Sequence, residues 1–453
     1  MGLGLDPSLR PCVLLLVLAF SGAAFGQPPA SAAFDLEACR SSARDQHPRL
    51  AAARAQAAAA EARKAIAFSG FLPSLSAEGS FTAVRGAGGQ ASLRPAGTEP
   101  STSLLGAPDY EVWGAGLTLR QTIWDFGRTL HAHGAAAAAQ QAAEQDERIL
   151  LETLDVEAEA AFRTAMAADQ LVVAMEEASA RAASHLARAS ARTEVGLRPR
   201  YDVSRAEVEV SNAALALVAA MNARELARAQ LANACGLAEL PADRPLVVPP
   251  ARAVPELPKL EEALADALSR RSEIAAAQAR VEAAERALSA SRALHLPSLA
   301  ATGTVNYRGS DIQELGGGWS ALVQLNVPLL AGGADSARVR EAEANLALAR
   351  ASLENTRRLV RLDIESAFLA MREAGARMAA AKALEVSASE GMQLAEVRYE
   401  TGAGDALELA DAQAAFASSR ATTVRAALDA SVAAARLERA LGQRSPPPRE
   451  VER

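Results

Sequence analysis

Two proline-free stretches of equal length constrain this chain more than any other feature. Each lies between two glycines, the first between Gly127 and Gly196 and the second between Gly333 and Gly402. Alanine, leucine, glutamate and arginine dominate both stretches, and all four residue types favour helix. At a rise of 1.5 Å per residue, each stretch predicts a rod of roughly 100 Å. Helices of that length are typical of coiled coils, solenoids and tube walls rather than of a globular core.

The segments around the two rods repeat in the same order. Ahead of each rod, a helical segment leads into the sequence Leu-Pro-Ser-Leu, at residues 72–75 and 296–299. Two stretches then alternate apolar with small or polar residues, which is the period of a β-strand. A shorter helix follows each rod, so the order helix, strand, strand, long helix, short helix is predicted twice.

The repeat fixes the predicted boundaries. The first repeat covers 34–236, with strands at about 72–85 and 111–123 and the long helix at 127–195. The second covers 259–441, with strands at about 297–308 and 318–328 and the long helix at 333–400. Pro48 lies inside the opening helical pattern of the first repeat, so a helix is expected to begin there after a short turn. The opening helix of the second repeat is expected at about 260–294.

Three segments lie outside the repeats. Arg10, the apolar run 13–20 and the small residues at 24–26 predict a secretory signal peptide over 1–26. Six prolines between Pro241 and Pro258 predict an irregular linker over 237–258. The tail 442–453 is proline-rich and charged, which is typical of disorder. No other segment reaches about 18 consecutive apolar residues, so no transmembrane helix is expected.

Composition and motifs argue against several classes of function. The net charge is −7 with no long run of one sign, so nucleic acid is not an expected partner. The chain has no HExxH, Walker or GxSxG motif, so no enzyme activity and no cofactor are expected. His131 and His133 lie two apart on a predicted helix and do not share a face, so no metal site is expected there.

The strands predict a membrane sheet that one chain cannot close. Trp113 and Trp319 each lie at the start of a return strand, where membrane-interface aromatics occur. Open strand edges in a bilayer would leave backbone groups unpaired. Two chains would give eight strands, a barrel filled by side chains, whereas three give twelve. The predicted fold class is therefore mainly α with a membrane β-barrel contribution, built from two structural repeats.

The strand-to-rod junctions and the second turn carry a resemblance to a known family. The junctions read Gln121-Thr122-Ile123-Trp124-Asp125-Phe126-Gly127-Arg128 and Val327-Pro328-Leu329-Leu330-Ala331-Gly332-Gly333, and the turn reads Arg398-Tyr399-Glu400-Thr401-Gly402 with Asp411-Ala412-Gln413. With the two Leu-Pro-Ser-Leu openings, they make the chain from about residue 34 to 441 similar to the TolC-like outer-membrane efflux protein family. The first turn departs from the pattern at Thr193, Pro199 and Glu207.

The resemblance implies a homotrimer with a twelve-stranded outer-membrane β-barrel in lipid and a periplasmic α-helical tunnel. It also implies docking to a periplasmic adaptor (membrane fusion) protein and to an inner-membrane transporter. The expected function is the outer-membrane channel component of a tripartite efflux pump or type I secretion system, acting as a passive duct. Drugs, metal ions and secreted polypeptides all stay open as cargo. The alternative is a periplasmic adaptor or coiled-coil scaffold without a pore.

The resemblance also assigns a constriction at the periplasmic mouth. Glu408 and Asp411 follow Gly402 at the positions of the family's constriction aspartates. Spaced three apart, they face one side of a helix. Three chains would then form two stacked rings of carboxylates that favour cations. For Glu408 the alternative is a capping box with Asp405 as N-cap.

Two further site predictions follow from the resemblance. Tyr399 and Asp202 match positions whose hydrogen bonding holds related ducts closed, so a latch between the two turns is expected. The alternative is that Tyr399 packs against the turn while Asp202 caps a helix or pairs with a nearby arginine. Cys39 and Cys235 match helix ends that are stacked end to end, so a disulfide is expected. The alternative is two buried thiols in alanine-rich packing.

Overall fold

The computed structural model describes residues 34–84, 110–240, 244–247 and 260–443. The predicted signal peptide over 1–26 lies outside the described residues, as do most of the linker and the tail beyond residue 443. The first repeat comprises α1 (Leu36–Gln46), α2 (Pro48–Ser69), β1 (Ser74–Val84), β2 (Tyr110–Trp124), α3 (Arg128–Glu194) and α4 (Arg200–Ala234). The second comprises α5 (Leu260–Arg270), α6 (Ser272–Arg292), the 3-10 turn η1 (Ala293–His295), β3 (Ser298–Gly309), β4 (Gly316–Asn326), α7 (Ala334–Thr401) and α8 (Ala406–Ala440). The predicted order of helix, strand, strand, long helix and short helix is confirmed in both halves, and α2 begins at Pro48 as expected. The expected short turn before Pro48 is wrong, because Asp35 caps an 11-residue helix, α1, ahead of it.

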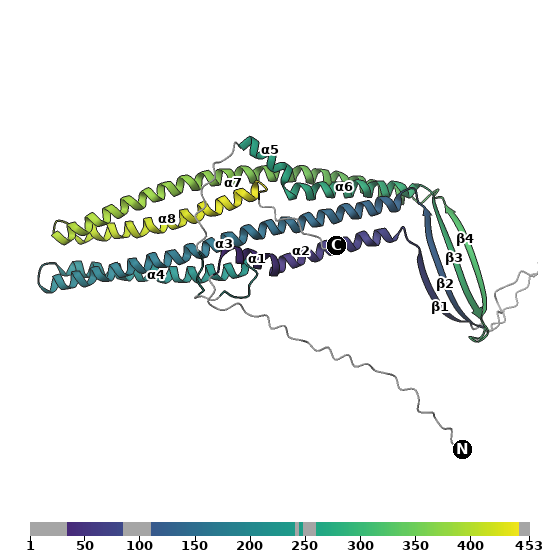
Figure 1. The fold of residues 1–453 in the computed structure, drawn as a ribbon, viewed down its shortest axis with the longest axis horizontal. Coiled ribbons are helices and arrows are strands. Elements are labelled where there is room, and N and C mark those ends of the chain that lie inside the picture. Colours follow the sequence, from purple (N-terminus) through teal and green to yellow (C-terminus); the bar gives the residue numbers. More distant parts are fainter. Residues whose placement is uncertain (1–33, 85–109, 241–243, 248–259, 444–453) are drawn as a thin grey trace, which may run out of the picture.

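The two long helices run along the length of the molecule. Figure 1 shows α3 and α7 turning back at one end into α4 and α8, while α2 and α6 flank them toward the other end, where the sheet lies. Helix α3 packs on α2 and α4 of its own repeat and on α6 and α8 of the other. The two repeats are therefore joined side by side along α3.

All four described strands form one antiparallel sheet in the order β1-β2-β3-β4. Strand β2 pairs with β3 as well as with β1, so the strands of the two repeats are joined in one sheet, as the predicted membrane sheet requires. Apolar residues match across the sheet: Phe81 lies opposite Trp113, Leu117 opposite Val305, and Val305 opposite Trp319. One face is thus continuously apolar, and β1 and β4 are the edge strands among those described.

Buried alanines allow close packing between the rods. Most of the buried apolar residues in the described part of the chain are alanines. On α7, Leu346, Leu353, Val360 and Ala367 recur every seven residues; Leu346, Val360 and Ala367 are buried, and Leu353 packs against the same core cluster as Val360 and Ala367. Small side chains in these positions let helix axes approach closely, so the core is thin and extended.

Acidic side chains of α3 face arginines of α1. The carboxylate of Glu159 is fully buried and accepts from Arg40 Nη2 at 2.7 Å and from Arg163 Nη2 at 2.8 Å. Arg44 donates two hydrogen bonds to Asp155, at 3.0 and 2.5 Å. A buried carboxylate is costly unless it is paired and hydrogen-bonded. These contacts therefore specify how α1 is placed against α3.

The opening helix of the second repeat is broken, so the predicted single helix over about 260–294 is wrong. Arg271 separates α5 from α6 with extended backbone angles, φ −69° and ψ 125°. Its guanidinium donates to Glu273 at 2.8 and 2.7 Å, to Asp363 at 2.8 Å and to the carbonyl of Ala440 at 3.1 Å. These tertiary hydrogen bonds compensate for the break in the helix.

Part of the predicted linker contacts the start of the first repeat, although its described residues form no helix or strand. Phe34 and Leu246 form a parallel β-bridge, and Arg244 lies 4.8 Å from the centroid of the Phe34 ring. This bridge holds the start of the first repeat against the segment that follows it. Within the residues that the structure describes, no helix is long and apolar enough to cross a membrane.

Candidate functional site

The turns α3–α4 and α7–α8 lie next to each other at the end of the molecule opposite the sheet (Figure 1). Gly196 and Gly402 adopt left-handed backbone angles, φ +73° and +77°, which glycine tolerates best. Shortly after Gly402, the Gly404 N–H donates to the carbonyl of Arg398 at 2.9 Å, and in the first turn Leu197 donates likewise to Arg192. Both rods therefore end at a left-handed glycine, but the closing hydrogen bond spans five residues in the first turn and six in the second.

The helices that leave these turns are capped differently. Asp405 caps α8, accepting from the N–H of Glu408 at 2.7 Å. Helix α4 has Pro199 at its N-cap, with no side-chain cap. Asp202 is instead the third residue of α4, so the alternative that it serves as the N-cap is wrong. An acidic residue in the first turn still interacts favourably with the helix dipole.

Tyr399 is the largest buried side chain of this region, at 2% exposure. Its ring lies against the ring of His185, 5.2 Å between centroids, and beneath the guanidinium of Arg198 at 4.7 Å. The hydroxyl has no hydrogen-bond partner within the described structure. Burial, and next the charge of Asp202, raise the pKa of the phenol, so it is protonated at neutral pH and can donate a hydrogen bond.

Asp202 is also buried, at 5% exposure, and belongs to the same cluster. Its Oδ2 lies 4.0 Å from Arg198 Nη1 and accepts no hydrogen bond from the described residues. Arg198 itself donates to the carbonyls of Tyr399 at 3.1 Å and Gly404 at 3.4 Å. The structure thus brings Tyr399 and Asp202 into electrostatic contact through Arg198 without a hydrogen bond between them.

The two predicted constriction residues lie in different surroundings. Glu408 Oε1 is 3.0 Å from Arg398 Nε, within the same turn. Asp411 is largely exposed and faces the other hairpin, where Arg205 Nη2 is 3.8 Å from its Oδ1. Both carboxylates therefore have a cationic neighbour, which sequence spacing did not indicate.

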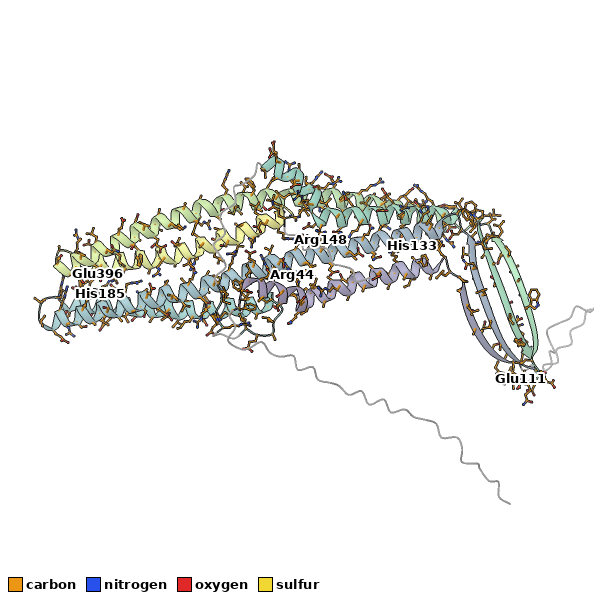
Figure 2. The ribbon with its side chains drawn as sticks, in the orientation of Figure 1. Arg44, Glu111, His133, Arg148, His185 and Glu396 are labelled. Atoms are coloured by element: carbon orange, nitrogen blue, oxygen red, sulfur yellow. A yellow bond between two sulfur atoms is a disulfide. The ribbon has the colours of Figure 1, made fainter. Side chains whose placement is uncertain are left out.

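Several residues that bind the hairpins together were not predicted. His185 is fully buried and its Nδ1 lies 3.0 Å from Glu209 Oε2. Arg188 reaches from α3 to Glu396 and Glu400 of α7, at 3.3 and 3.6 Å. Figure 2 shows His185 and Glu396 near this end of the rods. A single histidine or arginine in a long helix carries no signal of its partners, so sequence reasoning could not have found this cluster.

A disulfide joins the two halves of the first repeat midway along the rods. Cys39 of α1 and Cys235, the C-cap of α4, are bonded through their sulfur atoms, with their Cα atoms 5.1 Å apart. Both residues are fully buried beside Phe34, Phe162 and Leu231. The structure therefore supports the predicted bridge over the alternative of two separate thiols.

The sheet carries exposed aromatic residues at both of its ends. Trp319 is 81% exposed, and Trp113 lies against Phe81 with ring centroids 4.5 Å apart. At the opposite end, next to the helices, Trp124 and Phe126 are exposed with their rings 6.0 Å apart. The second pair was not predicted, although both residues stand in the first strand-to-rod junction. Aromatic side chains at both ends of an apolar band are typical of membrane interfaces.

His133 packs against aromatic rings of the first repeat. The ring of His133 contacts Phe68 at 5.7 Å and Phe71 at 6.0 Å between centroids. Across the described residues, no group of three or more histidine, cysteine, aspartate or glutamate side chains is placed to hold a metal ion.

Comparison with known proteins fits this architecture. The profile of the family described as "Outer membrane efflux protein" matches residues 39–237 and 263–443. The chain therefore belongs to the outer membrane efflux protein family, whose members are channel proteins, and membership implies an outer-membrane location.

The chain is also similar to individual proteins, at 21–30% sequence identity. The chain is 30% identical over 315 residues to "Protein CyaE" of Bordetella pertussis, covering 67% of this chain and 65% of that protein. It is 29% identical over 205 residues to "Outer membrane protein OprJ" of Pseudomonas aeruginosa, covering 42% of this chain and 43% of that protein. The matched parts thus span less than two thirds of these curated relatives. The solved structure of the outer-membrane channel OprN has the same fold, with a TM-score of 0.78, 21% identity, and coverage of 90% of this chain and 89% of that one.

Proposed function

We propose that three copies of the chain form a passive duct through the outer membrane, as the outer component of an efflux pump or secretion system. The observation that carries the proposal is the sheet, which has one continuous apolar face and two edge strands at one end of the long hairpins. Unpaired edges in a bilayer would cost several kcal/mol per backbone group. Pairing β4 of one chain with β1 of the next removes these edges and gives a closed ring of twelve strands.

The dimensions of the sheet support a membrane span. Trp113 lies near the start of β2 and Trp124 at its end. At about 3.4 Å per residue they are separated by about 37 Å along the strand, or about 26 Å along the membrane normal at a tilt of about 45°. The apolar band of such sheets is about 25 Å tall. Trp113 therefore marks one membrane interface, and Trp124 with Phe126 marks the other. Trp319, opposite Val305 and so level with Leu117, lies four residues inside the first of these levels.

The rods supply the part of the duct outside the membrane. At 67 and 68 residues, α3 and α7 each extend about 100 Å. Because every helix leaves the same end of the sheet, a ring of three chains encloses a tunnel of six hairpins. The free turns at its far end are the surface for a periplasmic adaptor and an inner-membrane transporter. The proposal includes no catalytic or cofactor role.

Closure of the duct is assigned to the hairpin turns. The protonated hydroxyl of Tyr399 and the carboxylate oxygen Oδ2 of Asp202 are both buried and lack hydrogen-bond partners among the described residues. A hydrogen bond to a carboxylate contributes about 1.5–3 kcal/mol when shielded from water. A small rotation that joins these atoms in all three chains would hold the mouth shut until an adaptor binds. Glu408 and Asp411 line the same narrow end.

The proposal is tested by expressing the full chain and fractionating the cells. We expect a detergent-requiring, heat-modifiable trimer in the outer membrane that forms channels in planar bilayers. A monomeric protein recovered from the soluble periplasmic fraction, with no conductance, would overturn the duct and favour an adaptor or scaffold.

A further inference from the structure

The two repeats carry opposite charges at one equivalent position near the turns. Helix α4 begins at Arg200 and α8 at Ala406, and both are 35 residues long. Counted from these helix starts, Asp202 is equivalent to Glu408 and Arg205 to Asp411. At the third residue of these helices both repeats have an acidic side chain, Asp202 and Glu408. At the sixth residue, α4 has the cation Arg205 and α8 has the anion Asp411.

Arg205 and Asp411 also face each other across the hairpins. Their closest atoms are 3.8 Å apart, and the side chains are 33% and 72% exposed. Both line a cavity of about 320 Å³ between α3, α4 and α8. The other charged residues lining that cavity have partners of their own: Glu209 contacts His185, and Arg181 lies 3.6 Å from Glu177. Arg205 is thus the cation opposite Asp411.

The neighbouring acidic position does not offset this arrangement. Asp202 is buried beside Arg198, and Glu408 pairs with Arg398 in its own turn. The ion pair that links α4 to α8 at this level is therefore that of Arg205 and Asp411. In a ring of three chains they amount to three cations and three anions.

We propose that Arg205 determines the ion selectivity of the mouth by neutralising the charge of Asp411. This inference rests on the proposed function, because it requires the turns to surround a conducting lumen. It replaces the cation-favouring ring predicted from the sequence with a mixed ring of zero net charge. The mouth then discriminates little between small cations and anions, and multivalent cations do not block it.

The ion pair is suited to a test by substitution. Exposed pairs at this separation contribute little to folding, so removing the guanidinium should leave the fold intact. Its charge still acts on ions in the lumen, since interactions between charges extend about 10 Å at about 0.1 M salt. Arg205→Gln leaves Asp411 uncompensated, Arg205→Lys keeps the charge, and Arg205→Gln/Asp411→Asn removes both charges. Arg224→Gln, farther along the same helix and away from the turn, is the matched control.

The measurement is the reversal potential of bilayer channels in a KCl gradient near about 0.1 M, with and without hexaamminecobalt(III). Arg205→Gln should raise the ratio of potassium to chloride permeability about tenfold and introduce block by the trivalent cation. The lysine variant, the double variant and Arg224→Gln should stay near the wild-type ratio. An unchanged ratio of potassium to chloride permeability in Arg205→Gln, or a wild-type channel already blocked by hexaamminecobalt, overturns the role proposed for Arg205 and leaves the proposed function intact. Absence of channels from the wild-type protein overturns the proposed function instead.

Discussion

Arg271 should contribute far more to stability than the arginine beside it. The Arg271 side chain is 4% exposed and bonds to Glu273, Asp363 and the carbonyl of Ala440, which joins α5 and α6 to α7 and α8. Arg270 is 55% exposed and makes one ion pair, to Asp266 one helical turn away, at 2.9 Å. The two residues are adjacent and chemically identical, so each serves as the control for the other.

The expected magnitudes follow from burial. Removing one partner of a buried ion pair costs about 3–5 kcal/mol, because the remaining charge stays buried without compensation. Glu273 is the group left behind, with a side chain 20% exposed and Arg439 Nη2, 3.6 Å away, as its remaining cationic neighbour. An exposed pair within one helix contributes about 0.3–0.5 kcal/mol. Arg271→Ala should therefore destabilise each chain roughly ten times more than Arg270→Ala.

The assay is urea unfolding of the purified protein in detergent, followed by far-ultraviolet circular dichroism at neutral pH. A lower midpoint for Arg271→Ala, with Arg270→Ala close to wild type, is the expected result. Equal midpoints for the two variants would refute the reasoning, since they would show that the joint between α5 and α6 is not held by buried charge.

The pH dependence provides a second check on the same residue. Burial alone would raise the pKa of Glu273, but hydrogen bonds from Arg271 outweigh it and hold this pKa below its usual value. A depressed pKa contributes stability above the unfolded-state pKa, near 4.5, that is lost as the pH falls through the folded value. The difference between wild type and Arg271→Ala should therefore shrink as the solution is acidified below about pH 4.5.

Three further substitutions test other parts of the structure. Burial raises the pKa of Glu152, and the hydrogen bond from Ser272 only partly opposes this. The free energy of unfolding of the wild type should therefore fall relative to that of Glu152→Gln as the pH rises from about 4 to about 7. A constant difference between the urea midpoints of the two proteins across that range would contradict this. Tyr399→Phe removes only the hydroxyl and should raise the single-channel open probability, whereas wild-type gating would assign Tyr399 to packing. Mass spectrometry of unreduced, alkylated protein should recover Cys39 and Cys235 as one linked peptide, and the double alanine variant should lose about 2–5 kcal/mol of stability; alkylation of both cysteines would rule the bridge out.

Local sequence signals predicted the elements well where they were strong. Left-handed glycines at Gly127, Gly196, Gly333 and Gly402 delimit both rods, and proline-free, alanine-rich sequence leaves helix as the favoured conformation between them. Alternating residues identified all four strands. The break at Arg271 could not be read in this way, because the first repeat marks its break with Pro48 while the second relies on distant hydrogen bonds.

The residues of the candidate site also fall into a group that could be predicted from local sequence and a group that could not. Tyr399, Asp202, Glu408 and Asp411 could be named because they occupy positions in a recurring turn. Their neighbours could not, since Arg205 meets Asp411 from the other hairpin, in the opposite half of the sequence. Contacts between the repeats depend on how the rods lie side by side, and a sequence period does not encode that placement.

The disulfide has a consequence for how the protein matures. It closes a ring over a sequence separation of 196 residues, entirely within the first repeat. During synthesis, Cys235 follows Cys39 before any residue of α5 to α8 has been made. A thiol oxidant acting on the emerging chain can therefore link α1 covalently to the end of α4 while the second repeat is still absent. Helices α7 and α8 then pack against a first repeat that already contains its disulfide. In cells that lack such an oxidant, this covalent step is absent from the order of assembly.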